Sequence, residues 1–147
     1  MPLVTNRKAG FNYEILEKYT AGVELFGFEV KSLQGSHGSL EGAYVMIRGN
    51  EAFVAHMFVP PYQAGNTPKD YDPYRNRKLL LHKNEIYDLE KAEKTKGLTI
   101  IPISVYNKGG KIKADIAIVR GKKKFDKRQA TKKRETERET RREFVDK

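Results

Sequence analysis

Hydrophobic and polar positions mostly alternate along the chain before residue 120, and this is the period of β-strands rather than of helices. Residues 13–18 alternate in this way. A second apolar run follows at residues 23–26, after the small residues Thr20, Ala21 and Gly22. Because glycine weakens a strand interior, the pattern predicts two adjacent strands here.

Two further pairs of strand-forming runs are joined by glycine-containing turns, which predicts two hairpins. The runs cover residues 43–48 and 52–59 in the first hairpin, and residues 98–106 and 111–119 in the second. Pro102 lacks a backbone donor, so its strand is predicted to lie at a sheet edge or to contain a bulge. In the last run one face is apolar and consists of Ile112, Ala114, Ile116 and Ile118.

Helical spacing is clearest at residues 83–96, where Ile86 and Leu89 fall on one side, acidic residues lie early and lysines lie late. A shorter helix is predicted at residues 29–33, because apolar side chains there are three positions apart. Residues 62–77 have no period and are predicted to form a long loop. Five or six strands with one or two helices fit a small β-barrel better than a sandwich, and such barrels are common platforms for RNA.

Composition narrows the possible functions. The chain has 147 residues, which suits one domain with a real core, and it has no Cys and only three His. Disulfides and thiol catalysis are therefore excluded, a metal site is not expected, and no cofactor is expected. The chain starts without an apolar leader and has no window of about 18 to 20 apolar residues, so a cytoplasmic protein with no membrane partner is expected.

The positive charge is concentrated at the C-terminus. The whole chain has a formal net charge of +10, of which residues 120–147 contribute +7. We therefore divide the chain into a body, residues 1–119, and a basic tail, residues 120–147. The tail has too few apolar residues to fold alone, so we expect it to be disordered when free and helical along an anionic surface. A solvated surface helix or an inert solubility tail is the alternative.

Residues that could carry catalysis are sparse. Asp70 and Asp72 form the nearest carboxylate pair, but they lie in the long loop without a histidine or third carboxylate nearby, and they are interpreted as turn formers. The same loop interleaves Tyr71, Tyr74, Arg75 and Arg77. Aromatic and cationic side chains in this mixture bind exposed nucleotides, although the tyrosines could equally anchor the loop to the body.

Several short strings occur in an order that resembles one family, the small protein B (SsrA-binding protein) family. The most specific are Glu29-Val-Lys-Ser-Leu33, Arg77-Lys-Leu-Leu-Leu81 and Gly121-Lys-Lys-Lys-Phe-Asp-Lys-Arg128, and Asn6-Arg-Lys-Ala9 precedes them. Matching pieces span residues 6–128. Near Gly10, Phe11 and Thr20 the chain departs from the family pattern, which puts individual contacts there in doubt.

The resemblance implies a mainly β fold, an OB-type barrel with two or three short helices and a basic C-terminal tail. It implies an RNA-binding protein without enzymatic activity that acts in trans-translation. The expected partners are the tRNA-like domain of transfer-messenger RNA, the stalled ribosome, whose vacant mRNA channel the tail would occupy, and elongation factor Tu. A monomer is expected.

The resemblance also assigns site residues by motif. In the body, the residues expected to bind RNA are Asn6, Arg7, Lys8, Glu29, Lys31, Arg77, Lys78, Leu80 and Lys113. In the tail, the residues expected to contact the ribosome are Gly121, Lys122, Lys123, Asp126, Lys127 and Arg128. A glutamate on an RNA-binding face is costly unless it accepts from a base edge or holds a cation in place, and Leu80 fits the core slightly better than the surface.

Other functions stay open from the sequence alone. A general basic RNA-binding or ribosome-associated barrel would share the fold and bind any RNA through its charge, with steep salt dependence. An RNA-processing enzyme is a further possibility, and the missing constellation of His, Cys and carboxylates argues against it.

Overall fold

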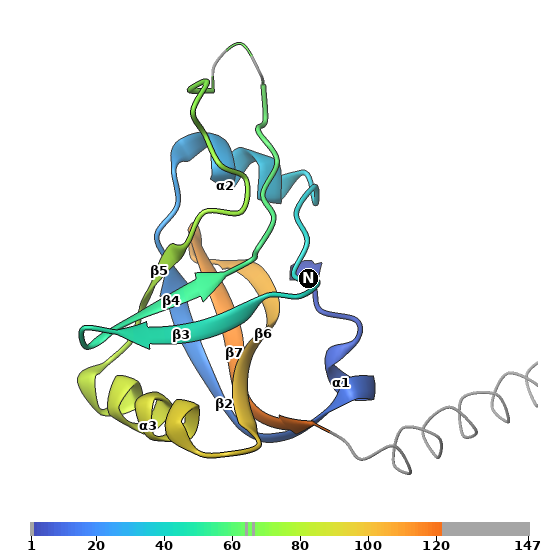
Figure 1. Cartoon of the computed structure of the whole chain (residues 1–147). Helices are drawn as coiled ribbons and strands as arrows, with labels where there is room; N and C mark the ends of the chain where they lie inside the picture. The colour runs from blue at the N-terminus through green and yellow to red at the C-terminus, as the bar shows by residue number, and fades with distance from the viewer. Residues whose placement is uncertain (1, 64, 66, 122–147) are drawn as a thin grey trace, which may run out of the picture.

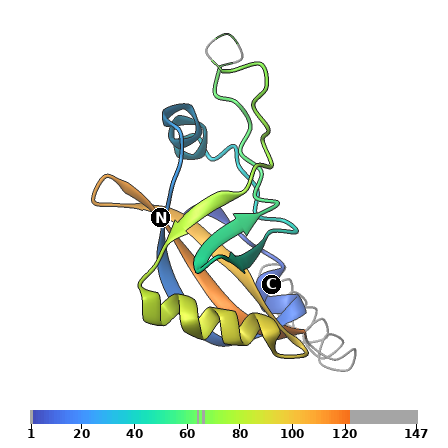
Figure 2. The same ribbon diagram turned by 60° about the vertical axis from the view of Figure 1, so that its left-hand side comes forward.

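Seven antiparallel strands form one strongly curved sheet in the computed structural model, which describes residues 2–63, 65 and 67–121. The strands are hydrogen-bonded in the order β1-β6-β7-β2-β5-β4-β3. They cover β1 (Pro2–Thr5), β2 (Tyr13–Val23), β3 (Tyr44–Arg48), β4 (Glu51–Ala55), β5 (Arg77–Leu80), β6 (Leu98–Lys108) and β7 (Lys111–Gly121). The sheet curls until β3 lies against β6, as Figures 1 and 2 show. This confirms the predicted mainly β barrel.

Three helices accompany the sheet in the part of the chain that the structure describes: α1 (Ala9–Asn12), α2 (Gly27–Gln34) and α3 (Lys83–Lys94). Helices α2 and α3 lie at opposite ends of the barrel (Figure 1). Helix α3 is the predicted long helix, and it buries Leu89 and Ala92 while it packs against β3 and β6. Within the described residues, no helix is long and apolar enough to cross a membrane.

The barrel core follows the predicted alternation of β7. Ile112, Ala114, Ile116 and Ile118 all point inward and are buried in one large apolar cluster. Ala117 and Val119, on the other face of the same strand, are also buried, because α1 and β6 cover them with Ala9 and Ile101. The second half of β7 is therefore packed on both faces and holds the end of the body rigid.

Three local predictions differ from the structure. Residues 13–23 form one strand rather than two, because Ala21 and Gly22 stay in register with Ala114 and Lys113 of β7. Strand β1 was not predicted, since its short apolar stretch becomes a strand only by pairing with β6. The alternatives for Pro102 resolve as a bulge, because the β6–β7 register shifts between Pro102 and Ser104 and β6 has a partner on each side.

The predicted long loop connects β4 to β5 and rises beside α2 (Figure 1). Two of its residues have clear structural roles. The carboxylate of Asp72 accepts a hydrogen bond of 2.9 Å from the backbone N–H of Tyr74, which confirms its interpretation as a turn former. The side chain of Tyr71 is half-buried against α2, where its ring meets that of Phe28 edge-on at 4.8 Å.

Candidate nucleic-acid interface

Leu80, Gly22 and Lys113 form a row across three neighbouring strands. Gly22 of β2 pairs with Leu80 of β5 on one side and with Lys113 of β7 on the other. Residues directly opposite each other share a face of the sheet, so Leu80 and Lys113 flank a position that has no side chain. A Cβ atom on Gly22 would lie 3.3 Å from both Cβ and Cδ1 of Leu80. The glycine therefore keeps the space between leucine and lysine open.

Leu80 is a surface residue, with 52% of its area exposed. The preference for a core position was wrong, and the reason is the alternation of β5: Arg77 and Leu79 point inward, and Lys78 and Leu80 point outward. Because Leu80 shares its face with Lys113, an apolar side chain and a cation lie close together, and this pair suits a ligand that has both an apolar plane and a negative charge.

A groove of about 280 Å³ starts from this row. Its lining is largely apolar and includes Leu25, Val30 and Ile112, while Lys111 and Lys113 supply cations from the start of β7. Figure 2 shows the turn between β6 and β7 projecting beside α2. An unpaired nucleotide has an apolar base and an anionic phosphate, so its chemistry matches the groove.

A second hollow, of about 550 Å³, lies on the other side of the row and also uses Gly22, Leu80 and Lys113. Its remaining lining is mostly polar and comprises Lys18, Tyr19, Thr20, Leu81, His82 and Glu85. Leu80 and Lys113 therefore stand between two depressions on one face.

One acidic group on this face is held by hydroxyl donors. The carboxylate of Asp115 accepts hydrogen bonds from the hydroxyl of Tyr106 at 2.8 Å and from that of Thr20 at 3.1 Å. The bond from Tyr106 to Asp115 raises the pKa of the tyrosine hydroxyl above its ordinary value, so the hydroxyl stays protonated at neutral pH. Thr20 is one of the residues that depart from the family pattern, and its hydroxyl helps to hold Asp115, which is two residues from Lys113 in β7.

A buried ion network lies beneath α2 at the same end of the barrel. The side chains of Glu29 and Arg77 have no exposed area, and Arg77 Nε donates to Glu29 Oε2 at 2.8 Å. Arg77 also donates to the carbonyl oxygens of Met57, Pro73 and Arg75 at 2.7, 3.0 and 3.1 Å. These bonds connect α2 to β5 and to both ends of the long loop.

The charged form of Glu29 is strongly favoured. Burial by itself raises the pKa of the Glu29 carboxyl. This effect is outweighed by hydrogen bonds from the Arg75 side chain, the Phe26 backbone N–H and the Tyr71 hydroxyl, and by the charge of Arg77. The pKa of Glu29 therefore lies below its ordinary value. Burial and the bond to Glu29 raise the pKa of the Tyr71 hydroxyl to about 12. The carboxylate is ionised and the phenol neutral throughout the physiological range.

The positions of Glu29 and Arg77 require a correction. Both were expected to bind RNA, and in the structure neither has surface that an RNA could reach. Arg77 is internal because the short string that begins with it alternates inward and outward along β5. Glu29 lies on α2, where its carboxylate holds this arginine in place. The alternation of that string is the signal that could have placed Arg77 beside Leu79 inside the barrel.

The sequence left two uses open for the aromatic and cationic side chains of the loop, and the structure shows the anchoring use for Tyr71. The Tyr71 hydroxyl lies 2.8 Å from Glu29 Oε2 and from the carbonyl oxygen of Val59, and accepts from Arg77 Nη2 at 2.9 Å. Tyr71 therefore anchors the loop. Tyr74 stays 51% exposed, and the Arg75 side chain stays 26% exposed, so both remain accessible to a partner.

Lys31 and Lys78 are at the margins of this surface. Lys31 is exposed on α2, and its Nζ lies 6.0 Å from the ring centroid of Tyr62. Lys78 points outward from β5 like Leu80, but its Nζ is 3.2 Å from a carboxylate oxygen of Glu51, which offsets its charge.

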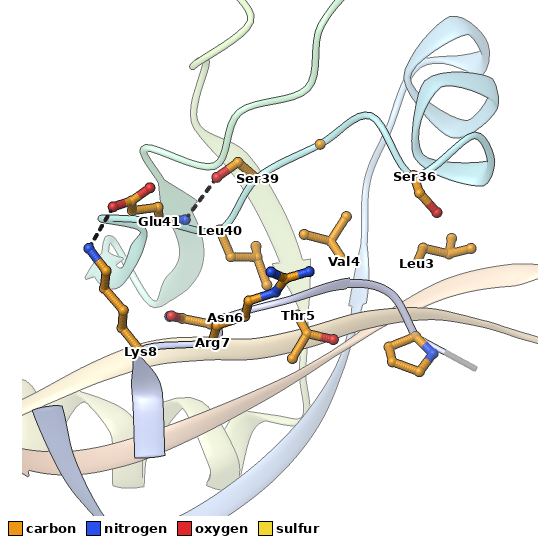
Figure 3. A pocket seen from close by; sticks show the side chains of 12 residues that line it. Leu3, Val4, Thr5, Asn6, Arg7, Lys8, Ser36, Ser39, Leu40 and Glu41 are labelled. Carbon is orange, nitrogen blue, oxygen red and sulfur yellow. Dashed lines mark hydrogen bonds and ion pairs between the residues drawn. The ribbon is translucent and has the colours of Figure 1, made fainter. Parts of the chain in front are cut away.

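The N-terminal candidates lie on a different surface. Asn6, Arg7 and Lys8 line a hollow of about 770 Å³ between the N-terminal segment and the connection from α2 to β3 (Figure 3). The Asn6 amide donates to the carbonyl oxygen of Pro102 at 3.1 Å, and Lys8 pairs with Glu41 at 2.9 Å. Arg7 and Lys8 are both exposed, and the guanidinium of Arg7 extends over the hollow.

The two surfaces are at opposite ends of the β2–β7 ladder. Gly22 pairs with Lys113 at one end, and Tyr13 pairs with Gly121 at the other. At about 3.3 Å per residue, these ends are about 30 Å apart along the strand. Asn6 and Lys8 line a hollow with Tyr13, so they belong to the Gly121 end. The structure therefore does not bring the body candidates into one site.

Gly121 is the last residue of β7 and is exposed. The other tail candidates, Lys122, Lys123, Asp126, Lys127 and Arg128, lie outside the described residues. Among residues 2–63, 65 and 67–121, no three His, Asp or Glu side chains are grouped so that they could hold a metal ion.

Comparisons with known proteins agree along the whole chain. The profile of the SmpB protein family matches residues 3–146. An SsrA-binding protein of Malacoplasma penetrans is 47% identical over 95% of this chain and 94% of its own length. An SsrA-binding protein of Elusimicrobium minutum is 48% identical over 99% of this chain and 94% of its own length.

A solved structure adds the third comparison. One of its chains superimposes with a TM-score of 0.69 and 36% sequence identity over 86% of this chain and 92% of that chain, in work described as "tmRNA-SmpB: a journey to the center of the bacterial ribosome". Family profile, sequence relatives and backbone geometry thus point to the same group of proteins. The chain belongs to the SmpB protein family.

Proposed function

We propose that this protein binds the tRNA-like domain of transfer-messenger RNA and delivers it to stalled ribosomes for trans-translation. The main support for this proposal is the row of Leu80, Gly22 and Lys113 beside an apolar groove with a cationic rim. The chain that carries this surface is 47% identical to an SsrA-binding protein. Folded RNA is recognised by shape, by phosphate contacts and by stacking on unpaired bases, and this surface offers groups for each.

The architecture supports a division of labour between the body and the tail. Strand β7 starts at the groove with Lys111 and Lys113 and ends at Gly121, on the far side of the barrel. Gly121, the last described residue, is therefore far from RNA bound at the groove. We therefore propose that the body binds transfer-messenger RNA and that the basic tail contacts the ribosome, with Gly121, Lys122, Lys123, Asp126, Lys127 and Arg128 as the first contacts in the mRNA channel.

The family resemblance adds further features to the proposal. The protein would be a monomer in the cytoplasm and would catalyse no reaction itself. It would share the delivery complex with elongation factor Tu. Arg7 and Lys8 offer a second cationic surface for RNA at the Gly121 end of the barrel.

The test compares RNA binding with function. The intact protein is titrated against the tRNA-like domain and against an unrelated hairpin of equal length, at low and near-physiological salt. Selective binding of the tRNA-like domain that persists in salt supports the proposal. Equal binding of both RNAs, lost in parallel with salt, would replace it with a general RNA-binding function driven by the net charge of +10.

A truncation then separates the two regions. A chain that ends at Gly121 keeps the whole of β7 and the ion pair of 2.8 Å between Arg120 and Glu14. It should bind the tRNA-like domain selectively and fail to support peptide tagging on stalled ribosomes. Equal loss of both properties would contradict the division of labour.

A further inference from the structure

We propose that Phe26 and Arg75 form a stacking site for an unpaired RNA nucleotide, and that Glu29 is a positioning residue that holds Arg75 in this site. The inference rests on the proposed function and adds a contact to it. It also gives Glu29, which no RNA can touch in this structure, a defined part in RNA binding.

The first observation is a stack at the surface. The guanidinium carbon of Arg75 lies 4.1 Å from the centroid of the Phe26 ring, and the two side chains come from α2's N-terminal boundary and from the long loop. The Phe26 ring also lies 5.6 Å from the ring of Phe28, but Phe26 stays 51% exposed, so part of its apolar ring is uncovered. A planar cation on an aromatic ring is a stack that a nucleobase can extend, because bases stack on aromatic rings and on guanidinium planes alike.

The second observation is how the donors of Arg75 are used. Nε and Nη2 bind the carboxylate of Glu29 at 3.1 and 2.5 Å, which fixes the plane of the guanidinium. Nη1 has only a long contact of 3.5 Å, to the carbonyl oxygen of Asn76. This nitrogen is the donor that remains for a phosphate or a base edge.

The third observation is the charge of the network. Two arginines share one carboxylate, and Arg77 is buried while Arg75 reaches the surface. The unbalanced positive charge is therefore presented at Arg75. A cation and an exposed ring together favour a nucleotide over an acidic peptide, since a carboxylate would use the charge and leave the ring uncovered.

The position of the stack fits the groove. Phe26 directly follows Leu25, which lines the groove with Leu80 and Lys113. An RNA segment that places one base in the groove therefore has the stack of Phe26 and Arg75 beside it. Lys31, one turn along α2, adds a further cation on the exposed side of the helix.

The experiment measures the affinity of the full-length protein for the tRNA-like domain and for the control hairpin. Phe26→Ala should bind about 5- to 100-fold more weakly, the range expected for the loss of one stacked base. Phe26→Tyr should bind like the native protein and Phe26→Leu should not, because stacking needs an aromatic ring and not merely an apolar side chain. The unfolding temperature should change little, since the ring is half exposed.

Tyr87→Ala is the matched control. Tyr87 is 59% exposed on α3 with Lys91 Nζ 4.4 Å from its ring centroid, so it has the same kind of aromatic–cation pair far from the groove. This variant should bind RNA like the native protein. Equal losses for Tyr87→Ala and Phe26→Ala, or native affinity of Phe26→Leu or Phe26→Ala for both RNAs, would overturn the stacking site.

The positioning role of Glu29 is tested in two backgrounds. Glu29→Gln also removes the counter-ion of buried Arg77, so binding is compared at a temperature where circular dichroism shows every variant to be folded. Under that condition Glu29→Gln should weaken RNA binding in the native chain and have no further effect in Arg75→Ala, if it acts through Arg75. A loss that persists in the Arg75→Ala background would overturn this role. Failure of the proposed function looks different: the native protein would not distinguish the tRNA-like domain from the hairpin, whatever the variants do.

Discussion

Arg77 Nε donates to Glu29 Oε2 across 2.8 Å in a part of the barrel where neither side chain has any exposed area. The pair ties α2 to β5, and through Tyr71 and Arg75 it also fixes the long loop. A charged pair in this position is costly to bury, and it is stable here because nearly every donor and acceptor is satisfied. The face that carries Leu80 and Lys113 is therefore supported from below by ionic groups.

Removal of one partner should destabilise the fold strongly. Glu29→Gln leaves the buried guanidinium of Arg77 without its counter-ion, and we expect a loss of about 3–5 kcal/mol in the free energy of unfolding. Urea denaturation monitored by circular dichroism measures this loss. Glu90→Gln, which breaks the surface pair of Glu90 and Lys94 on α3, is the control and should cost far less. Similar losses for both variants would refute the structural role of the network.

Because of the Glu29 carboxylate, the free energy of unfolding should decrease as the pH falls into the acid range. The pKa of Glu29 in the folded protein lies below its ordinary value, so in acid the unfolded chain binds this proton before the folded protein does. The stabilisation is therefore fully present above the unfolded value of about 4.3 and is lost as the pH falls through the lower folded value. Urea midpoints from pH 7 to pH 3 test this. The stability difference between native protein and Glu29→Gln should stay constant down to about pH 5 and then shrink.

The opening at Gly22 predicts a coupling with Leu80. In Gly22→Ala the new Cβ lies 3.3 Å from Cβ and from Cδ1 of Leu80. Cδ1 can rotate away because this leucine is exposed, whereas Cβ is fixed by the backbone of β5. The displaced side chain should disturb the surface between Leu80 and Lys113 and weaken binding of the tRNA-like domain. In a double-mutant cycle, Leu80→Ala should reduce the effect of Gly22→Ala, with a coupling of about 0.5–1.5 kcal/mol in binding free energy. Strict additivity would mean that the glycine is not needed for this spacing.

The sequence predicted well what depends on local pattern. The inward face of β7, the hairpin at Gly49 and Asn50 and the helix that buries Leu89 follow from periods of two and of 3.6 and from turn chemistry, and each is present in the structure. The barrel itself was predicted from the number of such strands. The body of the fold was therefore accessible without any knowledge of the partner.

What the sequence could not provide depends on tertiary pairing. Gly22 indicated a break by its own propensity, and its two partner strands overrode it. Arg77 carries the same charge as an RNA-binding arginine, and only its register in β5 shows that it is internal. Thr20 and Asp115 are 95 positions apart, so their hydrogen bond has no signature in the chain. Site residues were thus predicted by type, while their exposure and grouping required the fold.

The contribution of Lys113 to RNA binding should be electrostatic. This lysine stands at the rim of both hollows beside Leu80, and its neighbour Asp115 is engaged by Tyr106 and Thr20. Lys113→Ala should weaken binding of the tRNA-like domain and reduce the slope of log affinity against log salt by about 1, the change expected for one lost phosphate contact. Lys94→Ala on α3 keeps the same loss of net charge but lies away from the groove, so its slope should match that of the native protein. An unchanged slope in Lys113→Ala would show that this lysine contacts no phosphate, and an equal reduction in both variants would show that it acts only through overall charge. Either result would mean that the row from Leu80 to Lys113 does not mark where RNA binds.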